Sequence, residues 1–270
     1  MDAVAAHRNM VRIACCNHKG GVGKTTCSVN LAAGLARLGW RVLVADADPQ
    51  AHLSASLGVS ASPAGGLAGV LRGLEPAGTA LVHEAGLAVL PGSAELAAVE
   101  GELSGQEAAG NRLATALAGL SGFDAAIIDC PPHLGPLTRQ ALAASDAVVV
   151  PMTPDFLAMQ SLAWLMDTLS SLADTDGGGP AVLGIAINRF CAQKRLHREV
   201  RGAVNAHFPG VPFTIAIREN VALAEAPSFG QDIFRYAPKS AGASDFTALC
   251  REAARRIEAL AAAADRSPTQ

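Results

Sequence analysis

The sequence predicts an α/β protein: a doubly wound, mostly parallel sheet flanked by helices on both faces, in a single domain. Short apolar runs of strand length alternate along the chain with stretches of helical spacing, which is the pattern of a parallel sheet covered by helices. Nearly all of these runs are continuously apolar, as expected for strands buried on both sides. With 270 residues, of which 50% are hydrophobic and 17% charged, the chain is long enough to bury such a core.

The first predicted unit is a strand, a loop and a helix. Residues 11–17 form an apolar run that ends in a glycine-rich turn, and residues 24–38 carry apolar side chains at near-helical spacing before Gly39. We expect further strands at residues 42–46, 87–91, 125–129, 147–152, 182–188 and 213–217. We expect further helices at residues 107–120, 136–144, 155–173, 194–207 and 243–264. Residues 174–180, DTDGGGP, are expected to form a surface loop.

The rest of the chain adds little beyond this one domain. We expect an N-terminal arm at residues 1–10, one domain over residues 11–264 and a frayed tail at residues 265–270. No apolar run reaches the roughly 18 to 20 residues that span a bilayer, and residues 1–12 lack the apolar core of a signal peptide. The six cysteines form no CxxC pair, which argues against a zinc site and a disulfide framework. We therefore expect a cytoplasmic protein with reduced thiols.

The most informative segment lies between the first strand and the first helix and reads NHKGGVGKTT over residues 17–26. Glycines let successive N–H groups turn inward and the helix start adds positive partial charge, so this loop suits a phosphate group. Lys24 would reach the β- and γ-phosphates, and Thr25 would ligate Mg²⁺. The residues expected to bind the phosphates are Gly20, Gly21, Val22, Gly23, Lys24, Thr25 and Thr26. The alternative is a plain glycine-rich turn, which two motifs further along the chain disfavour.

Two later strands end in carboxylates. Residues 42–50, VLVADADPQ, place Asp46 and Asp48 just before a proline, and residues 125–132, AAIIDCPP, place Asp129 at a strand end. The carboxyl ends of parallel strands are where such sheets build sites, and a strand-end aspartate of this kind is the Walker B arrangement that holds Mg²⁺ directly or through water. Each aspartate alone could be a turn or capping residue. Their order after the phosphate loop favours a nucleotide site.

The loop departs from the ordinary phosphate-loop pattern, because His18 stands where glycine is usual and Lys19 is additional. This variant resembles the deviant Walker A motif of the ParA/MinD family of ATPases, and the resemblance to the short ParA-type partition ATPases covers nearly the whole chain. Residues 153–158 and 225–230 also look like segments of that family. The resemblance implies that Lys19 reaches across a dimer interface to the partner's nucleotide.

The resemblance also implies ATP and Mg²⁺ as cofactors and a slow, partner-stimulated hydrolysis of ATP. Asp48 matches the catalytic aspartate that orients the attacking water, and it acts together with Lys19 and Lys24. Asp46 matches a carboxylate near the metal. The expected metal ligands are Thr25, Asp46 and Asp129. Asn188 matches the position that contacts the purine in the wider family, and a capping role is equally open.

Charge is distributed unevenly along the chain. Residues 189–256 carry eleven Lys and Arg against six Asp and Glu, a balance of +5, which leaves −8 for the rest of a chain whose net charge is −3. This segment could bind DNA phosphates, although each side chain could also lie on a solvated helix face. The candidate DNA contacts are Arg218, Arg235, Arg251, Arg255 and Arg256. The family's usual DNA-contacting arginine falls on Glu219 here, and Ala222 replaces a second arginine.

We therefore expect an ATPase whose ATP-bound homodimer binds nonspecific duplex DNA and segregates or positions a plasmid, a chromosome region or a protein cargo. A ParB-like or other cargo-linked protein would stimulate it, and its ATP-bound form would be nucleoid-associated. One alternative is a metabolic or maturation ATPase of the same fold, which the lack of a cysteine pair for a metal cluster disfavours. Another is a positioning ATPase that acts on a membrane or protein surface, but residues 251–264 offer only Ile257 and Leu260 as bulky apolar groups near their end.

Overall fold

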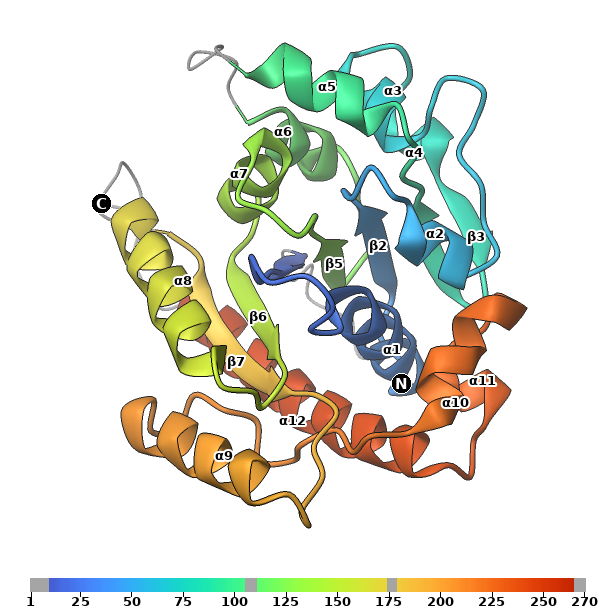
Figure 1. The fold of residues 1–270 in the computed structure, drawn as a ribbon. Helices are drawn as coiled ribbons and strands as arrows, with labels where there is room; N and C mark the ends of the chain where they lie inside the picture. The colour runs from blue at the N-terminus through green and yellow to red at the C-terminus, as the bar shows by residue number, and fades with distance from the viewer. Residues whose placement is uncertain (1–9, 105–110, 174–178, 265–270) are drawn as a thin grey trace.

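A seven-stranded sheet forms the centre of the molecule (Figure 1). The computed structural model describes residues 10–104, 111–173 and 179–264, so residues 1–9 of the predicted arm and the whole predicted tail lie outside the described residues. The strands are β1 (Val11–Cys15), β2 (Val42–Asp46), β3 (Val82–Glu84), β4 (Leu87–Leu90), β5 (Ala125–Asp129), β6 (Ala147–Met152) and β7 (Ala181–Ile187). Their order is β3-β4-β2-β5-β1-β6-β7, with every pair parallel except β3 and β4. The predicted doubly wound, mostly parallel sheet is confirmed.

Helices cover both faces of the sheet, and each face has its own hydrophobic core. One face packs against α1 (Lys24–Arg37), α2 (His52–Ser56), α10 (Val221–Glu225), the 3-10 helix η1 (Ala226–Phe229), α11 (Ile233–Tyr236) and α12 (Ala241–Ala264). The other packs against α3 (Leu67–Leu71), α4 (Ala77–Ala80), α5 (Leu96–Leu103), α6 (Arg112–Ala118), α7 (Pro136–Ala143), α8 (Ala158–Ala173) and α9 (Arg195–His207). Burial on both sides explains why the strands are continuously apolar. None of the helices in the described ranges has the length and apolar composition needed to cross a membrane.

The predicted strand at residues 213–217 is wrong. The N–H groups of Phe213 and Ile217 donate to two carbonyls of the edge strand β7, but these donors are four residues apart whereas the acceptors, in Ile185 and Ile187, are two residues apart. The extra residues bulge away from the sheet, and the N–H of Thr214 donates to a carboxylate of α12 at 3.0 Å. The segment is apolar because Phe213, Ile215 and Ile217 pack on the α12 side of the sheet and Ala216 packs on the other side, not because it forms a regular ladder.

The other elements differ from the predictions mainly at their ends. The predicted helices α1, α7, α9 and α12 are confirmed to within two residues. Helix α8 begins three residues late, because the Asp155 carboxylate accepts the N–H of Leu157 at 3.2 Å in a turn. Helix α6 begins after its cap, Asn111, and residues 107–110 of that prediction lie outside the described part. Several short elements were not predicted, because they contain too few residues to show the periodic spacing of apolar side chains. They are β3, α2, α3, α4, α5, α10, η1 and α11.

Three strand ends meet at one edge of the sheet and position the site. The register of β5 places Asp129 between Cys15 of β1 and Asp46 of β2. Strand β1 continues into the glycine-rich loop and then into α1, which begins at Lys24. Strand β2 continues into the turn that carries Asp48 and then into α2. The predicted loop and both carboxylate motifs are therefore brought together.

The packing of α1 on α12 leads to a prediction about stability. A Cβ on Gly34 of α1 would overlap the Sγ of Cys250 in α12 and lie 3.3 Å from Phe234. Gly34→Ala should therefore lower the free energy of unfolding by about 1–3 kcal/mol, as overpacking typically does. Gly101→Ala in the exposed part of α5, where a Cβ meets nothing within 4 Å, is the control and should be neutral or raise stability by up to about 1 kcal/mol. Urea unfolding compares them, and equal effects would contradict the close packing.

Candidate functional site

The glycine-rich loop has a fixed backbone conformation before α1. Gly21 and Gly23 have φ of +76° and +88°, a left-handed conformation that other residues rarely adopt. A Cβ on Gly23 would also lie 2.8 Å from the side-chain nitrogen of Asn188. Gly23 is therefore required for two independent reasons, and it directs the first N–H groups of α1 toward the mouth of the loop.

Hydrogen bonds to the ends of β6 and β7 hold this loop in place. The amide of Asn17 donates to the Pro151 carbonyl at 2.8 Å, and its oxygen accepts the N–H of Lys19 at 3.1 Å. Asn188, which is 5% exposed, donates to the Val22 carbonyl at 2.8 Å. The Asn188 amide nitrogen therefore holds the loop, a role in addition to the capping role and the purine contact expected from the sequence.

Lys24 places a cation at the mouth of the loop. Its side chain is 7% exposed, and its ammonium donates to the Lys19 carbonyl at 3.2 Å. The ammonium lies beside the N-terminus of a 14-residue helix, whose unpaired N–H groups carry positive partial charge. Together these groups form a site suited to a polyanion such as a nucleotide's phosphates.

Lys19, in contrast, is paired within the chain. Its ammonium donates to the Asp155 carboxylate at 2.5 Å, and the Thr153 hydroxyl donates to the same oxygen at 2.7 Å. Both side chains of the ion pair are partly exposed, at 31% and 39%, so the pair contributes little to stability. Lys19 must leave Asp155 before it can reach any group on a partner subunit.

Asp129 joins the start of α1 to the end of β5. The Thr25 and Ser28 hydroxyls donate to its two carboxylate oxygens, each at 2.7 Å. Burial, followed by the charge of Asp46, raises the pKa of Asp129 to about 7. Because the Thr25 hydroxyl donates its hydrogen to Asp129, the lone pairs of the Thr25 oxygen remain available to a cation. Hydroxyl and carboxylate oxygens are the ligands that Mg²⁺ prefers.

Asp46 lies beside Asp129 at the end of β2, and its carboxylate accepts hydrogen bonds from the protein itself. One oxygen accepts the N–H and the hydroxyl of Ser54, at 2.8 and 2.7 Å, and the other accepts the N–H of Asp48 at 3.2 Å. The side chain is fully buried, and burial raises its pKa. These bonds give the Asp46 carboxylate a structural task at the end of β2. Ser54 and Thr25 bind the two buried carboxylates, and Ser54 carried no motif that could have predicted this role.

Asp48 lies in the tight turn between β2 and α2. Its carboxylate is 7% exposed and accepts the N–H of Gln50 at 2.9 Å, which fixes the orientation of the side chain. The turn ends at Ala51, whose φ of +51° is unusual for a residue other than glycine. The conformation of this turn therefore decides where the Asp48 carboxylate points.

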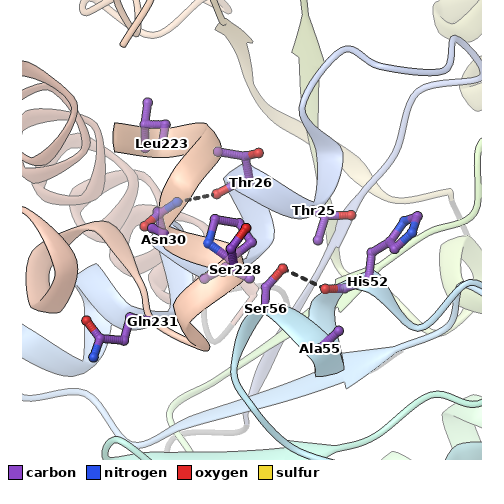
Figure 2. Close-up of a pocket in the computed structure, with 12 residues that line it drawn as sticks. Thr25, Thr26, Asn30, His52, Ala55, Ser56, Leu223, Ser228 and Gln231 are labelled. Atoms are coloured by element: carbon purple, nitrogen blue, oxygen red, sulfur yellow. Dashed lines mark hydrogen bonds between the residues drawn. The ribbon is translucent and has the colours of Figure 1, made fainter. Parts of the chain in front are cut away.

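A cavity of about 380 Å³ lies next to these residues, between the start of α1, helix α2 and the α10–η1 segment. Figure 2 shows the residues that line it, among them Thr25 and Thr26 of α1, His52 and Ser56 of α2, and Leu223 and Ser228 of the α10–η1 segment. The remaining labelled residues are Asn30, Ala55 and Gln231. Of these residues, the sequence motifs predicted only the two threonines as ligands, since the others lie further along α1, on α2 or in residues 223–231.

The predicted DNA-contacting arginines have different surroundings. Arg256 donates to the carbonyls of Leu183, Val211 and Pro212 at 2.7–2.9 Å and stacks over Phe213. These bonds give Arg256 a structural role, so we remove it from the predicted set of DNA contacts.

Two others are held by carboxylates. Arg218 pairs with buried Asp245 at 2.7 Å, and Arg235 pairs with Glu84 at 3.2 Å. Arg251 and Arg255 are exposed one turn apart on α12. These two are the candidates best placed to contact a phosphate backbone.

Known proteins resemble this chain in sequence and in structure. The profile of a family described as an AAA domain matches residues 10–177. The chain is 41% identical over 248 residues to the chromosome-partitioning ATPase Soj of Thermus thermophilus, which covers 92% of this chain and 96% of that protein. It is 37% identical over 246 residues to the chromosome partitioning protein ParA of Caulobacter vibrioides, covering 89% and 92%. The crystal structure of cobyrinic acid a,c-diamide synthase from Mycobacterium smegmatis with bound ATP analog and magnesium has a TM-score of 0.79 at 30% identity, covering 93% and 96%.

The raised pKa of Asp129 predicts a pH-dependent stability without nucleotide or metal. The folded protein binds a proton on Asp129 up to about pH 7, whereas an unfolded aspartate releases it near pH 4. The free energy of unfolding should therefore fall as pH rises through this window, by at most about 1.4 kcal/mol per pH unit, and level off above pH 7. Asp129→Asn should weaken this dependence in urea unfolding from pH 5 to 8. An unchanged slope in the variant would show that other groups cause it.

Proposed function

Because this chain belongs to the Soj/ParA family of chromosome-partitioning ATPases, we propose that it binds ATP with Mg²⁺ and hydrolyses ATP to ADP and phosphate. The observation that carries this proposal is the buried Lys24 ammonium beside the N-terminus of α1, with Thr25 and Asp129 next to it. A solved relative at 30% identity contains an ATP analogue and magnesium, which supports the same ligands here.

The residues at the site fit Mg²⁺. Thr25 and Asp129 supply oxygen atoms, which a hard divalent cation prefers. No group of three or more His, Cys, Asp and Glu that could hold a metal occurs in the described part of the chain. We propose that Thr25 and Asp129 hold it, and that the bound ion would neutralise charge on the phosphates.

The remaining residues then have separable tasks in hydrolysis. Lys24 and the loop N–H groups, including those of Gly20, Gly21 and Val22, bind the β- and γ-phosphates, and Thr26 completes the start of α1 beside them. Asp48 accepts a hydrogen bond from the attacking water and so directs it toward the γ-phosphate. Such a site works by positioning and by electrostatic stabilisation, because there is little covalent chemistry for the protein to perform.

We propose that ATP also brings two copies of the chain together, with Lys19 released from Asp155 to contact the partner's nucleotide. The ATP-bound homodimer would bind duplex DNA without sequence preference through exposed basic residues, and a ParB-like or cargo-linked protein would stimulate its ATPase. It would thereby segregate or position a chromosome region, a plasmid or a protein cargo, associated with the nucleoid while ATP is bound. The names and the 37–41% identity of the Soj and ParA relatives support this role.

A second candidate is a metabolic ATPase of the same fold, because the cobyrinic acid a,c-diamide synthase matches 93% of this chain at 30% identity. The Soj relative matches a similar share of the chain at 41% identity, which favours partition. The gene next to this one distinguishes the two roles: a ParB-like DNA binder supports partition, and a cobyrinate-modifying enzyme supports metabolism.

Nucleotide binding and hydrolysis should be separable by mutation. Lys24→Ala removes the main side-chain counterion of the phosphates and should weaken ATP binding by about 100-fold or more. Asp48→Ala should bind ATP with near wild-type affinity, hydrolyse it at least about tenfold more slowly and accumulate as a dimer. Titration with a fluorescent ATP analogue, phosphate release and light scattering measure these effects. Undiminished ATP affinity in Lys24→Ala would refute the phosphate-loop assignment.

DNA binding should depend on ATP and on α12. Arg251→Glu and Arg255→Glu should each weaken retention of random duplex DNA several-fold and lower the slope of log affinity against log salt by about one. Arg139→Glu, an equal charge change at an exposed position of α7 on the other face, is the control. Glu219→Arg should strengthen binding, because it replaces a repulsive charge by an attractive one. A filter-binding titration that shows no ATP-dependent retention even at low salt would discard the DNA role.

A further inference from the structure

We infer that Ser54 is a positioning residue for ATP hydrolysis, because it fixes, through Asp46, the turn that carries Asp48. The inference rests on the proposed function and assigns the pair of Asp46 and Ser54 a role other than metal binding. Its basis is a set of buried hydrogen bonds that tie the end of β2, the Asp48 turn and the start of α2 to one carboxylate.

The Asp46 carboxylate links two segments that would otherwise move independently. One oxygen accepts the N–H of Asp48 at 3.2 Å, at the beginning of the turn. The other accepts both the N–H and the hydroxyl of Ser54, at 2.8 and 2.7 Å, in the first turn of α2. The turn that presents the Asp48 side chain is therefore fastened at both of its ends to a single buried group.

The Ser54 hydroxyl makes a second bond that leaves it no alternative position. It accepts the N–H of Gly92 at 3.0 Å, on the loop after β4, while it donates to Asp46. Gly92 lies so close that a Cβ there would be 2.7 Å from the Asp46 carbonyl oxygen and 2.9 Å from its Cγ. Because these groups are buried, loss of the hydroxyl leaves the Gly92 N–H without its acceptor and leaves one Asp46 oxygen with only the Ser54 N–H, at a place that water does not easily reach.

Helix α2 is also fixed near its C-terminal end, so we expect loss of the Ser54 hydroxyl to shift the Asp48 turn. A Cβ on Gly230, which follows η1, would lie 3.2 Å from the Cα of Gly58, just after α2. The five-residue helix is thus held between η1 and the Asp46 carboxylate. Because η1 fixes one end of α2, the short segment that contains Asp48 is the part that moves when the Ser54 hydroxyl is removed.

Direct metal binding by Asp46 is the competing role, and it makes a different prediction. If Asp46 held Mg²⁺, disturbing it would raise the Mg²⁺ concentration needed for half-maximal activity. If it positions Asp48, the same disturbance lowers kcat while ATP binding and the Mg²⁺ requirement stay constant. Ser54 touches Asp46 but not the Thr25–Asp129 pair, so a graded series at Ser54 separates these outcomes.

The experiment compares Ser54→Thr, Ser54→Cys and Ser54→Ala in the full chain. We expect Ser54→Thr to retain kcat, Ser54→Cys to lower it and Ser54→Ala to lower it at least tenfold. The dissociation constant of a fluorescent ATP analogue and the half-maximal Mg²⁺ concentration should change less than threefold. Ser145→Ala, whose hydroxyl donates to a carbonyl within α7, is the matched control and should leave all three quantities unchanged. If Ser54→Ala does not fold, the ratio of kcat between Ser54→Cys and Ser54→Thr tests the inference instead.

Several results would overturn the inference. Equal kcat across the series would show that the Ser54 hydroxyl does not position Asp48. A rise in the Mg²⁺ requirement that parallels the loss of activity would assign Asp46 to the metal instead. A wild-type protein that binds the ATP analogue but releases no phosphate would overturn the proposed hydrolysis itself and this inference with it. Normal wild-type turnover with an unaffected Ser54→Ala variant would overturn this inference alone.

Discussion

The structure depends on the burial of two carboxylates side by side, Asp46 at the end of β2 and Asp129 at the end of β5. A buried carboxylate is costly unless hydrogen-bond donors replace the water it has lost. Here hydroxyl and N–H groups supply those donors, from the start of α1 for Asp129 and from the turn and α2 for Asp46. The burial that raises the pKa of both groups therefore also fixes the two segments that form the mouth of the site.

The phosphate loop is held by contacts at the ends of β6 and β7, away from β2 and the Asp48 turn. Asn17 bonds to the end of β6, and Asn188, just after β7, bonds to the loop. The loop and the Asp48 turn are thus anchored to different strands, with Asp129 between them. The start of α1 and the turn after β2 are therefore fixed by separate sets of contacts, as the proposed division between ATP binding and hydrolysis requires.

The fold and the main site could be predicted from the sequence because each depends on local pattern. Continuous apolar runs identified six of the seven strands, and the order of NHKGGVGKTT, Asp48 and Asp129 identified the site. Contacts between distant segments could not be predicted. Nothing near Asp46 in the sequence distinguishes a metal ligand from a carboxylate bound by Ser54, eight residues away. The apolar run at residues 213–217 likewise does not reveal that its hydrogen-bond donors are spaced differently from the acceptors of β7.

The same limit applies to surface charge, where a count of basic residues does not show which of them are free to bind a ligand. Arg256 donates hydrogen bonds to three backbone carbonyls, whereas Arg251 and Arg255 on the same helix are exposed. That helix, α12, packs at Cys250 against Gly34 and Asn30 of α1, the helix whose first residue is Lys24. A change at the nucleotide site that displaced α1 would therefore act on α12 beside Arg251, because a close-packed contact leaves no free space to absorb the movement.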